Sequence, residues 1–122
     1  MDADFIQKIE EICEGKEEVL NLWNKSIGDA GAQSLSTALM NENNKLTTLD
    51  LSSNKIGNEG VSSLSTALMN ENNKVTTLNL PQHSIGDQGV RYLSAALMNE
   101  NNKVTTLNLE KNNRGPNRCR LH

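Results

Sequence analysis

The sequence predicts an α/β fold, a solenoid in which units of one strand and one helix stack on one another. The first observation is an internal repeat, since residues 46–74 return almost letter for letter as residues 75–103, at an offset of 29 residues. A fixed period of this length is typical of repeat architectures. The second observation is that each copy carries the pattern of one short strand and one helix, which cannot bury its apolar edge without a neighbouring copy.

In the copy that begins at Leu46, Leu49 and Leu51 alternate with polar residues, which is the period of a strand with one buried face. A tight turn follows, and Asn58 is expected to cap the N-terminus of the next helix. Asn73 is expected to end that helix in a left-handed conformation. The apolar stripe of the helix consists of Val61, Leu64, Ala67 and Leu68.

Shifted copies extend this pattern at both ends. Residues 17–45 form a first, poorer copy, and residues 104–113 begin a fourth copy that breaks off. Stacked copies place equivalent leucines above one another, so we expect Leu78 to be fully buried between Leu49 and Leu107.

One motif runs through the strand, the turn and the helix of the second copy: Leu46-x-x-Leu49-x-Leu51-x-x-Asn54-x-Ile56-Gly57-x-x-Gly60-x-x-x-Leu64-x-x-x-Leu68. It resembles the leucine-rich repeat family, in particular its ribonuclease-inhibitor-like class, which is also found in NOD-like receptors and Ran GTPase-activating proteins. The resemblance covers residues 17–113 and implies a right-handed α/β solenoid, a horseshoe with a parallel sheet on its concave side and helices on its convex side. It also implies a protein that recognises other proteins far more often than it catalyses a reaction. Two copies depart from the motif, because Lys25 and His83 stand where Asn54 does.

The chain is expected to divide into three parts. Residues 1–15 form an N-terminal capping helix, residues 16–113 hold three full repeats and a partial fourth, and residues 114–122 are a basic tail. The apolar face of the helix contains Phe5, Ile6, Ile9, Ile12 and Cys13. A helix that binds a partner or a membrane surface is the alternative, although its acidic polar face argues against a membrane.

Composition restricts the function further. Hydrophobic residues make up 35% of the 122 residues, with one Trp, one Tyr and one Phe, so the core must be aliphatic. The formal net charge of −3 gives no general attraction to nucleic acid or to an anionic membrane. No apolar run is long enough to span a membrane, and the acidic start lacks the pattern of a signal peptide. Because Cys13 and Cys119 lie at opposite ends of the array, no disulfide is expected, and we predict a cytoplasmic protein.

The sequence offers no group of residues typical of an enzyme. It has two histidines, His83 and His122, and no Cys/His pair at the spacing of a zinc site. Serines recur at the same positions of successive copies, as surface residues of a repeat do. We therefore predict no catalytic activity, no metal and no cofactor.

Differences between the copies indicate where specificity would lie. Positions that are identical in every copy are those that the repeat geometry requires, so the variable positions and the outward strand columns are the candidates for partner binding. The candidate residues are Trp23, Thr48, Asp50, Ser52, Thr77, Asn79, Gln82, His83, Arg91 and Tyr92. Drift after a recent duplication would produce similar differences, and Trp23 could instead pack onto the N-terminal helix.

The function predicted from these features is a protein–protein interaction scaffold, which binds an unidentified protein through the concave sheet and the adjoining loops. The resemblance offers an alternative, a regulator of an enzyme that acts as a ribonuclease inhibitor or a GTPase activator. An inhibitor should have a strongly acidic concave face, where Asp50 is the only acid, and an activator needs a polar or basic rim residue such as Lys25. A fragment of a longer array without a function of its own is a third possibility.

The fourth copy predicts an open C-terminal edge. It begins correctly at Val104, but Arg114 replaces the isoleucine of the other copies and Pro116 replaces the N-cap, so no fourth helix should form. An uncovered last strand exposes unpaired backbone groups. The residues expected at this edge are Thr106, Leu107 and Leu109, with Leu93 and Leu97 only partly covered. We predict a two-fold homodimer through this edge, unless further repeats cover it.

Overall fold

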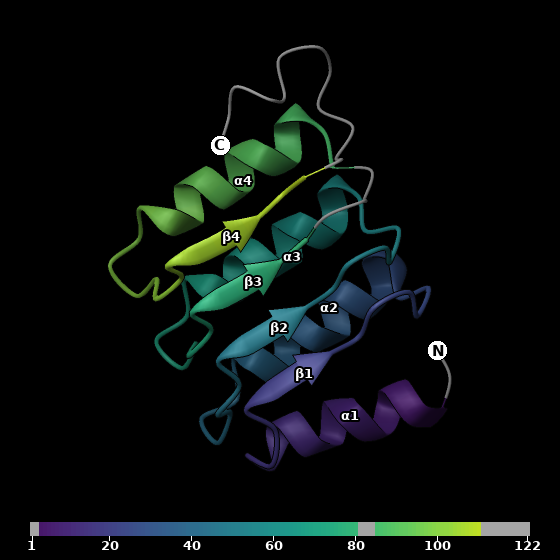
Figure 1. Ribbon diagram of the computed structural model, residues 1–122. Helices are drawn as coiled ribbons and strands as arrows, with labels where there is room; N and C mark the ends of the chain where they lie inside the picture. The colour runs from purple at the N-terminus through teal and green to yellow at the C-terminus, as the bar shows by residue number, and fades with distance from the viewer. Residues whose placement is uncertain (1–2, 81–84, 111–122) are drawn as a thin grey trace.

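The computed structural model describes residues 3–80 and 85–110 of the chain. The strands lie in one layer, and the helices that connect them lie in a second layer behind it (Figure 1). The elements are α1 (Ala3–Cys13), β1 (Val19–Asn21), α2 (Gly28–Leu39), β2 (Thr48–Asp50), α3 (Asn58–Leu68), β3 (Thr77–Asn79), α4 (Asp87–Leu97) and β4 (Thr106–Asn108). This alternation of strands and helices confirms the predicted α/β solenoid.

The four strands form one parallel sheet in the order β1-β2-β3-β4. Each strand pairs with the next in the same register, so that Leu49 aligns with Leu78 and Leu78 aligns with Leu107. Because these partners are one repeat apart in the sequence, the sequence repeat and the spatial repeat coincide. Leu78 is 1% exposed between its two neighbours, which confirms the predicted leucine column.

The core between the sheet and the helices is aliphatic, as the composition requires. The strands and their ends contribute leucines, the helices contribute leucines and alanines, and the turns contribute isoleucines. The largest fully buried side chains are Ile12, Leu35, Leu39, Leu46, Leu49, Leu51, Ile56, Leu64, Leu68, Leu78, Leu80 and Ile85. Each unit shares its apolar edge with the next unit, so burial of these side chains depends on stacking.

The first helix, α1, lies beside β1 and α2 at the N-terminal end of the sheet (Figure 1). Phe5 and Ile12 are buried in the common core. The apolar face is narrower than predicted, because Ile6 is 48% exposed. Lys8 joins α1 to the chain before β1 through an ion pair with Glu17, at 3.5 Å. The role of α1 as a cap and the division of the chain into three parts stay predictions.

A side chain from the preceding unit caps the start of α3. Oδ1 of Asp29 accepts hydrogen bonds from the N–H groups of Gly57, at 2.7 Å, and Gly60, at 3.0 Å. A Cβ atom on Gly60 would lie 2.6 Å from this Oδ1 and 2.6 Å from Cγ2 of Ile56. Glycine is therefore required at position 60, because any side chain would displace the cap.

Asn58 does not cap its own helix, so the prediction of a cap within the unit is wrong. Oδ1 of Asn58 accepts hydrogen bonds from the N–H groups of Gly86, at 2.9 Å, and Gly89, at 3.0 Å, in the next unit. The residue before α3 is Gly57, which is extended and makes no side-chain cap bond. Residue 58 is already helical, so it lies beyond the N-cap position and its side chain serves the neighbouring helix.

Replacing Asp29 by alanine should lower the free energy of unfolding by about 1–2 kcal/mol, because two N–H groups at the start of α3 lose their acceptor. Asp87 holds the same position in the last unit and is exposed, and it caps no helix among the described residues. Asp87→Ala is therefore the matched control, with a change of about 0.5 kcal/mol or less. Urea denaturation followed by far-UV circular dichroism measures both values, and equal losses would contradict the capping role of Asp29.

Asn54 closes the turns of two units at once. Its side chain is fully buried. Oδ1 accepts hydrogen bonds from the N–H groups of Lys25, at 2.7 Å, and Ile27, at 3.3 Å. Nδ2 donates to the carbonyl groups of Leu22, at 2.7 Å, and Leu51, at 3.0 Å. The first unit has Lys25 at the equivalent position, so Asn54 of the second unit supplies the hydrogen bonds to the turn of the first unit.

The asparagines in the turns after the helices stabilise these turns by other hydrogen bonds than predicted. Asn73 is not left-handed, because the non-glycine residues with positive φ are Asn24, Ser26, Ser53 and Lys55 within the described segments. The helix α3 ends at a right-handed Met69. Oδ1 of Asn73 instead accepts the N–H of Val75, and Nδ2 of Asn72 donates to the carbonyl of Met40 in the preceding unit, at 2.9 Å.

Candidate protein-binding surface

The candidate surface is the face of the sheet that points away from the helices, which we call the sheet face. In each strand the middle leucine points into the core, and the residues on either side of it point outward. The two outward columns are Val19, Thr48, Thr77 and Thr106, and Asn21, Asp50, Asn79 and Asn108. They run across all four strands, so they form one continuous polar surface.

The asparagine and aspartate column also has a structural role that the sequence analysis missed. Oδ1 of Asn21 accepts the N–H of Trp23, at 2.9 Å, and Oδ1 of Asp50 accepts the N–H of Ser52, also at 2.9 Å. Oδ1 of Asn108, at the end of β4, likewise accepts the N–H of Glu110, two residues later in the chain. These bonds hold the turn after each strand. The sequence indicates these bonds, because each strand ends with an Asn or an Asp.

Asn79 is the exception in this column. The residue two positions after it is Pro81, which has no backbone N–H to donate. Within the part of the chain that the structure describes, the Asn79 side chain makes no hydrogen bond of this kind. Its amide lies on β3, in the interior of the sheet face, and cannot accept the N–H two residues later that its equivalents accept.

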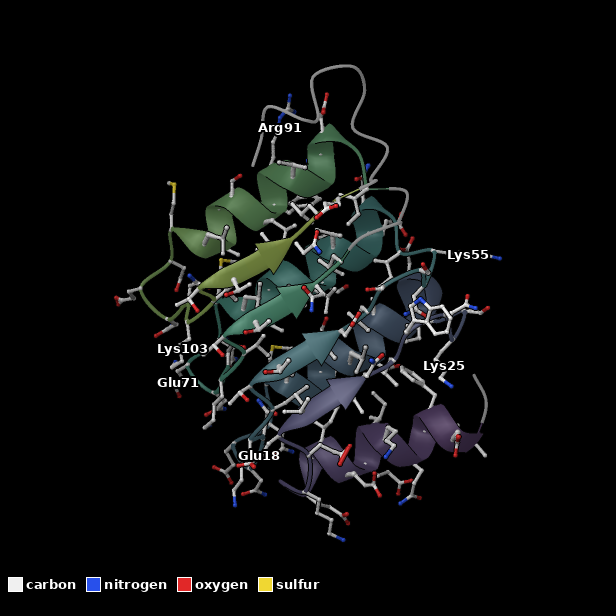
Figure 2. The ribbon with its side chains drawn as sticks, viewed as in Figure 1. Glu18, Lys25, Lys55, Glu71, Arg91 and Lys103 are labelled. Atoms are coloured by element: carbon white, nitrogen blue, oxygen red, sulfur yellow. The ribbon has the colours of Figure 1, made fainter. Side chains whose placement is uncertain are left out.

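Charged side chains lie at the rims of the sheet face rather than on it. Figure 2 shows Lys25 and Lys55 near the ends of the strands and Glu18, Glu71 and Lys103 near their beginnings. The only charge in the two outward columns is Asp50, whose Oδ1 is already bonded to the N–H and hydroxyl groups of Ser52. The sheet face is thus polar and nearly neutral.

Trp23 lies on the turn after β1 and is 59% exposed. The alternative prediction, that it packs onto the N-terminal helix, is therefore wrong. The buried side chains next to α1 at this end are Phe5 and Leu22, and the indole is not among them. An exposed tryptophan at the rim of the sheet is suited to anchor a partner.

A small hollow of about 190 Å³ lies between α1 and the end of β1. Its lining consists of Asp4, Phe5, Lys8, Asn21, Leu22 and Lys25. The pKa of Lys8 is raised, first by its hydrogen bond to Glu11 and then by the charge of Glu17. Lys8 is thus committed to ion pairs that hold α1, and the hollow is smaller than the roughly 300 Å³ of the smallest usual ligand pockets.

The structure separates two predicted residues from the sheet face. Arg91 and Tyr92 lie on α4, in the helix layer (Figure 2). Arg91 is exposed, whereas Tyr92 is half-buried against the core. Both residues thus lie on the helix of the third repeat, apart from the sheet face, and their part in binding a partner stays a prediction. Gln82 and His83 lie outside the described residues.

The residues predicted for self-association lie on β4, the last described strand, or directly after it, and their part in self-association stays a prediction. Thr106 is exposed, and Leu107 and Leu109 are half-buried. Leu93 is only 1% exposed, so the prediction that it is partly covered is wrong, because α4 turns this side chain into the core. The predicted absence of a fourth helix concerns residues outside the described segments.

The described residues also provide neither a metal site nor a membrane span. Among residues 3–80 and 85–110, no group of three or more His, Cys, Asp and Glu side chains could hold a metal ion. None of the helices in these segments is both long and apolar enough to cross a membrane.

Comparisons with known proteins agree with the repeat architecture. A family model described as "Leucine Rich repeat" matches residues 42–65 and 71–94. The structure is similar to that of "Leiomodin-1 Actin-Binding Site 2 (ABS2)", with a TM-score of 0.79 and 20% sequence identity, over 92% of this chain. The chain spans 65% of the length of that solved chain. A comparison with curated protein sequences gave no match.

Two successive units match the family model, and all four strands share the register of one repeat. At 20% identity the structural similarity speaks for the fold alone. Residues 42–65 and 71–94 are therefore leucine-rich repeats, and the leucine columns and the buried Asn54 agree with this assignment.

Proposed function

We propose that this chain is a protein-interaction module and that it binds its partner through the sheet face. The observation that supports this most is the pair of outward columns, which cross all four strands and take no part in the core. Leucine-rich repeats are typically binding modules rather than enzymes, and the similar structure is described as an actin-binding site. Actin is therefore the first partner to test.

The chemistry of the sheet face favours a partner that offers hydrogen-bonding groups rather than many charges. Thr48 and Thr77 supply hydroxyl groups, and Asn79 supplies an amide. Val19 on β1 and Trp23 at the rim supply exposed apolar contacts. Because such a surface has few aromatic or charged anchors, its affinity is modest.

The alternatives of an enzyme regulator are less well supported by the same residues. A ribonuclease inhibitor requires more acids than Asp50 on the sheet face, and a GTPase activator would depend on the exposed Lys25 at the rim. Ribonuclease activity and GTP hydrolysis, measured with and without the protein, distinguish these alternatives from the scaffold. We also propose that the repeats belong to the ribonuclease-inhibitor-like class and that the protein acts in the cytoplasm. A fragment without a function of its own is a further alternative.

The scaffold is tested by placing a photo-cross-linking amino acid at Thr77, in the interior of the sheet face, and at Thr66, on the exposed side of α3. Purified actin and then a cell lysate serve as probes. We expect a specific cross-link from position 77 and none from position 66. Thr77→Arg should weaken binding of the cross-linked partner by about tenfold or more, corresponding to about 1.4 kcal/mol.

Thr66→Arg adds the same side chain on the other layer and should leave that binding unchanged. Cross-links of equal yield from both positions, or a loss of binding in both arginine variants, would show that the partner does not use the sheet face.

A further inference from the structure

One side of α4 is exposed although the equivalent side of α2 and α3 is covered. Ala32 and Ser36 on α2 are buried beneath α3, at 0% and 2% exposed. The residues two repeats later are Val90, which is half-buried, and Ser94, which is exposed. Met98 follows one turn after Ser94 and is 84% exposed. We call Val90, Ser94 and Met98 the α4 stripe.

The strand layer is open at the same end. β4 pairs with β3 on one side, and no described strand pairs with its other side. Leu107 is half-buried, whereas Leu49 and Leu78 in the same column are at most 1% exposed. The α4 stripe and the side of β4 with which no described strand pairs together form the C-terminal end face, which has the apolar character of the interior interfaces between units.

The two ends of the solenoid differ, and this restricts how two chains can meet. At the N-terminal end, α1 lies against β1 and α2 (Figure 1). The C-terminal end face of one chain therefore cannot stack on the first repeat of another without displacing α1. Contact between two C-terminal end faces remains, and contact of a surface with its own copy is two-fold symmetric.

The end face is complementary to its own copy in an antiparallel arrangement. Around an axis near Ser94, Val90 of one α4 faces Met98 of the other, so apolar side chains meet on both sides of a small central residue. Lys103 precedes β4 and Glu110 follows it, and both are exposed. Antiparallel pairing of β4 with its copy brings each lysine near the opposite glutamate.

We propose that the C-terminal end face binds a second copy of this chain, with β4 paired antiparallel to β4 and the α4 stripes in contact. The pairing completes the hydrogen bonds of the edge strand and covers the apolar side chains of its leucine column. The surface is small compared with that of obligate dimers, so the association is weak and depends on protein concentration.

The first test is sedimentation velocity of the full chain over a series of concentrations. We expect the dimer fraction to rise with concentration, and Met98→Glu to shift the transition to concentrations about tenfold higher or more. Ala95→Glu is the matched control, since the column Thr37, Thr66 and Ala95 is exposed in every unit and lies off the end face. Met98 is already in solvent, so the melting temperature of its variant should remain that of the original chain.

A charge exchange tests the antiparallel orientation. Lys103→Glu alone and Glu110→Lys alone should each weaken the dimer, because each places like charges opposite one another. The double variant should restore the original dimer fraction. Failure of the double variant to recover, while both single variants weaken the dimer, would overturn the antiparallel arrangement.

Two results would overturn the proposal as a whole. One is a chain that stays monomeric at every concentration, and the other is an equal effect of Met98→Glu and Ala95→Glu. A chain that dimerises only after residues 111–122 are removed would show that the tail, rather than a second copy, occupies the end face.

Discussion

Leu78→Ala is expected to lower the free energy of unfolding by about 2–5 kcal/mol, the usual range for a leucine truncated in a core. The side chain is 1% exposed and packs between equivalent leucines of the two neighbouring strands. Its loss leaves a cavity that interrupts the core shared by three units. Urea denaturation monitored by circular dichroism measures the change. A variant that is already partly unfolded without urea has lost stability at the upper end of this range.

Leu107→Ala is the matched control, because this residue belongs to the same column but lies at the open end and is half-buried. Its truncation should cost less than that of Leu78, since solvent already reaches the site. If Leu78→Ala unfolds at the same urea concentration as the original chain, the shared leucine column does not stabilise the fold.

Asn54→Ala should have an effect of comparable size, about 3–5 kcal/mol. The substitution removes the acceptor for the N–H groups of Lys25 and Ile27 and the donor for the carbonyl groups of Leu22 and Leu51. Backbone groups left without a partner in the interior cost about 1–3 kcal/mol each, and relaxation of the turns recovers part of the sum. The expected result is a large loss of stability without a change in the apolar core.

Lys25→Ala provides the control for this prediction. Residue 25 holds the same position in the first unit, but its side chain is exposed and only its backbone N–H takes part in the network. Its stability should change by about 0.5 kcal/mol or less. A loss equal to that of Asn54→Ala would mean that the turn tolerates no substitution at all, irrespective of the amide.

The sequence was sufficient for the fold because the repeat carries the register. Once Leu49 and Leu78 are recognised as equivalent, the parallel sheet, the leucine column and the order of the strands follow from stacking. The same reasoning placed β4 last in the order of the described strands. Local pattern and global geometry agree in these features, since a unit has only one way to bury its apolar edge.

The sequence was insufficient where a side chain acts on another unit. Asn58 was expected to cap its own helix, but the N–H groups that it serves are 28 and 31 residues away. Inspection of a single unit cannot reveal such a bond. The residues that bind a partner cannot be derived in this way, because the variable positions Arg91 and Tyr92 lie on α4 whereas the outward columns lie on the sheet face.

The caps that pass from one unit to the next also give the array a direction. Asp29 serves α3 and Asn58 serves α4, so the cap of each of these helices comes from the unit before it. A unit added by duplication at the C-terminal side would find its helix cap already supplied by its predecessor. Loss of a unit from the N-terminal side, in contrast, would deprive the next helix of its acceptor. Asn54 acts in the other direction, because it closes the turn of the unit before it. Such an array can therefore lengthen at its C-terminal side with its helix caps in place, whereas the loss of a unit there would leave the turn of the preceding unit without its asparagine.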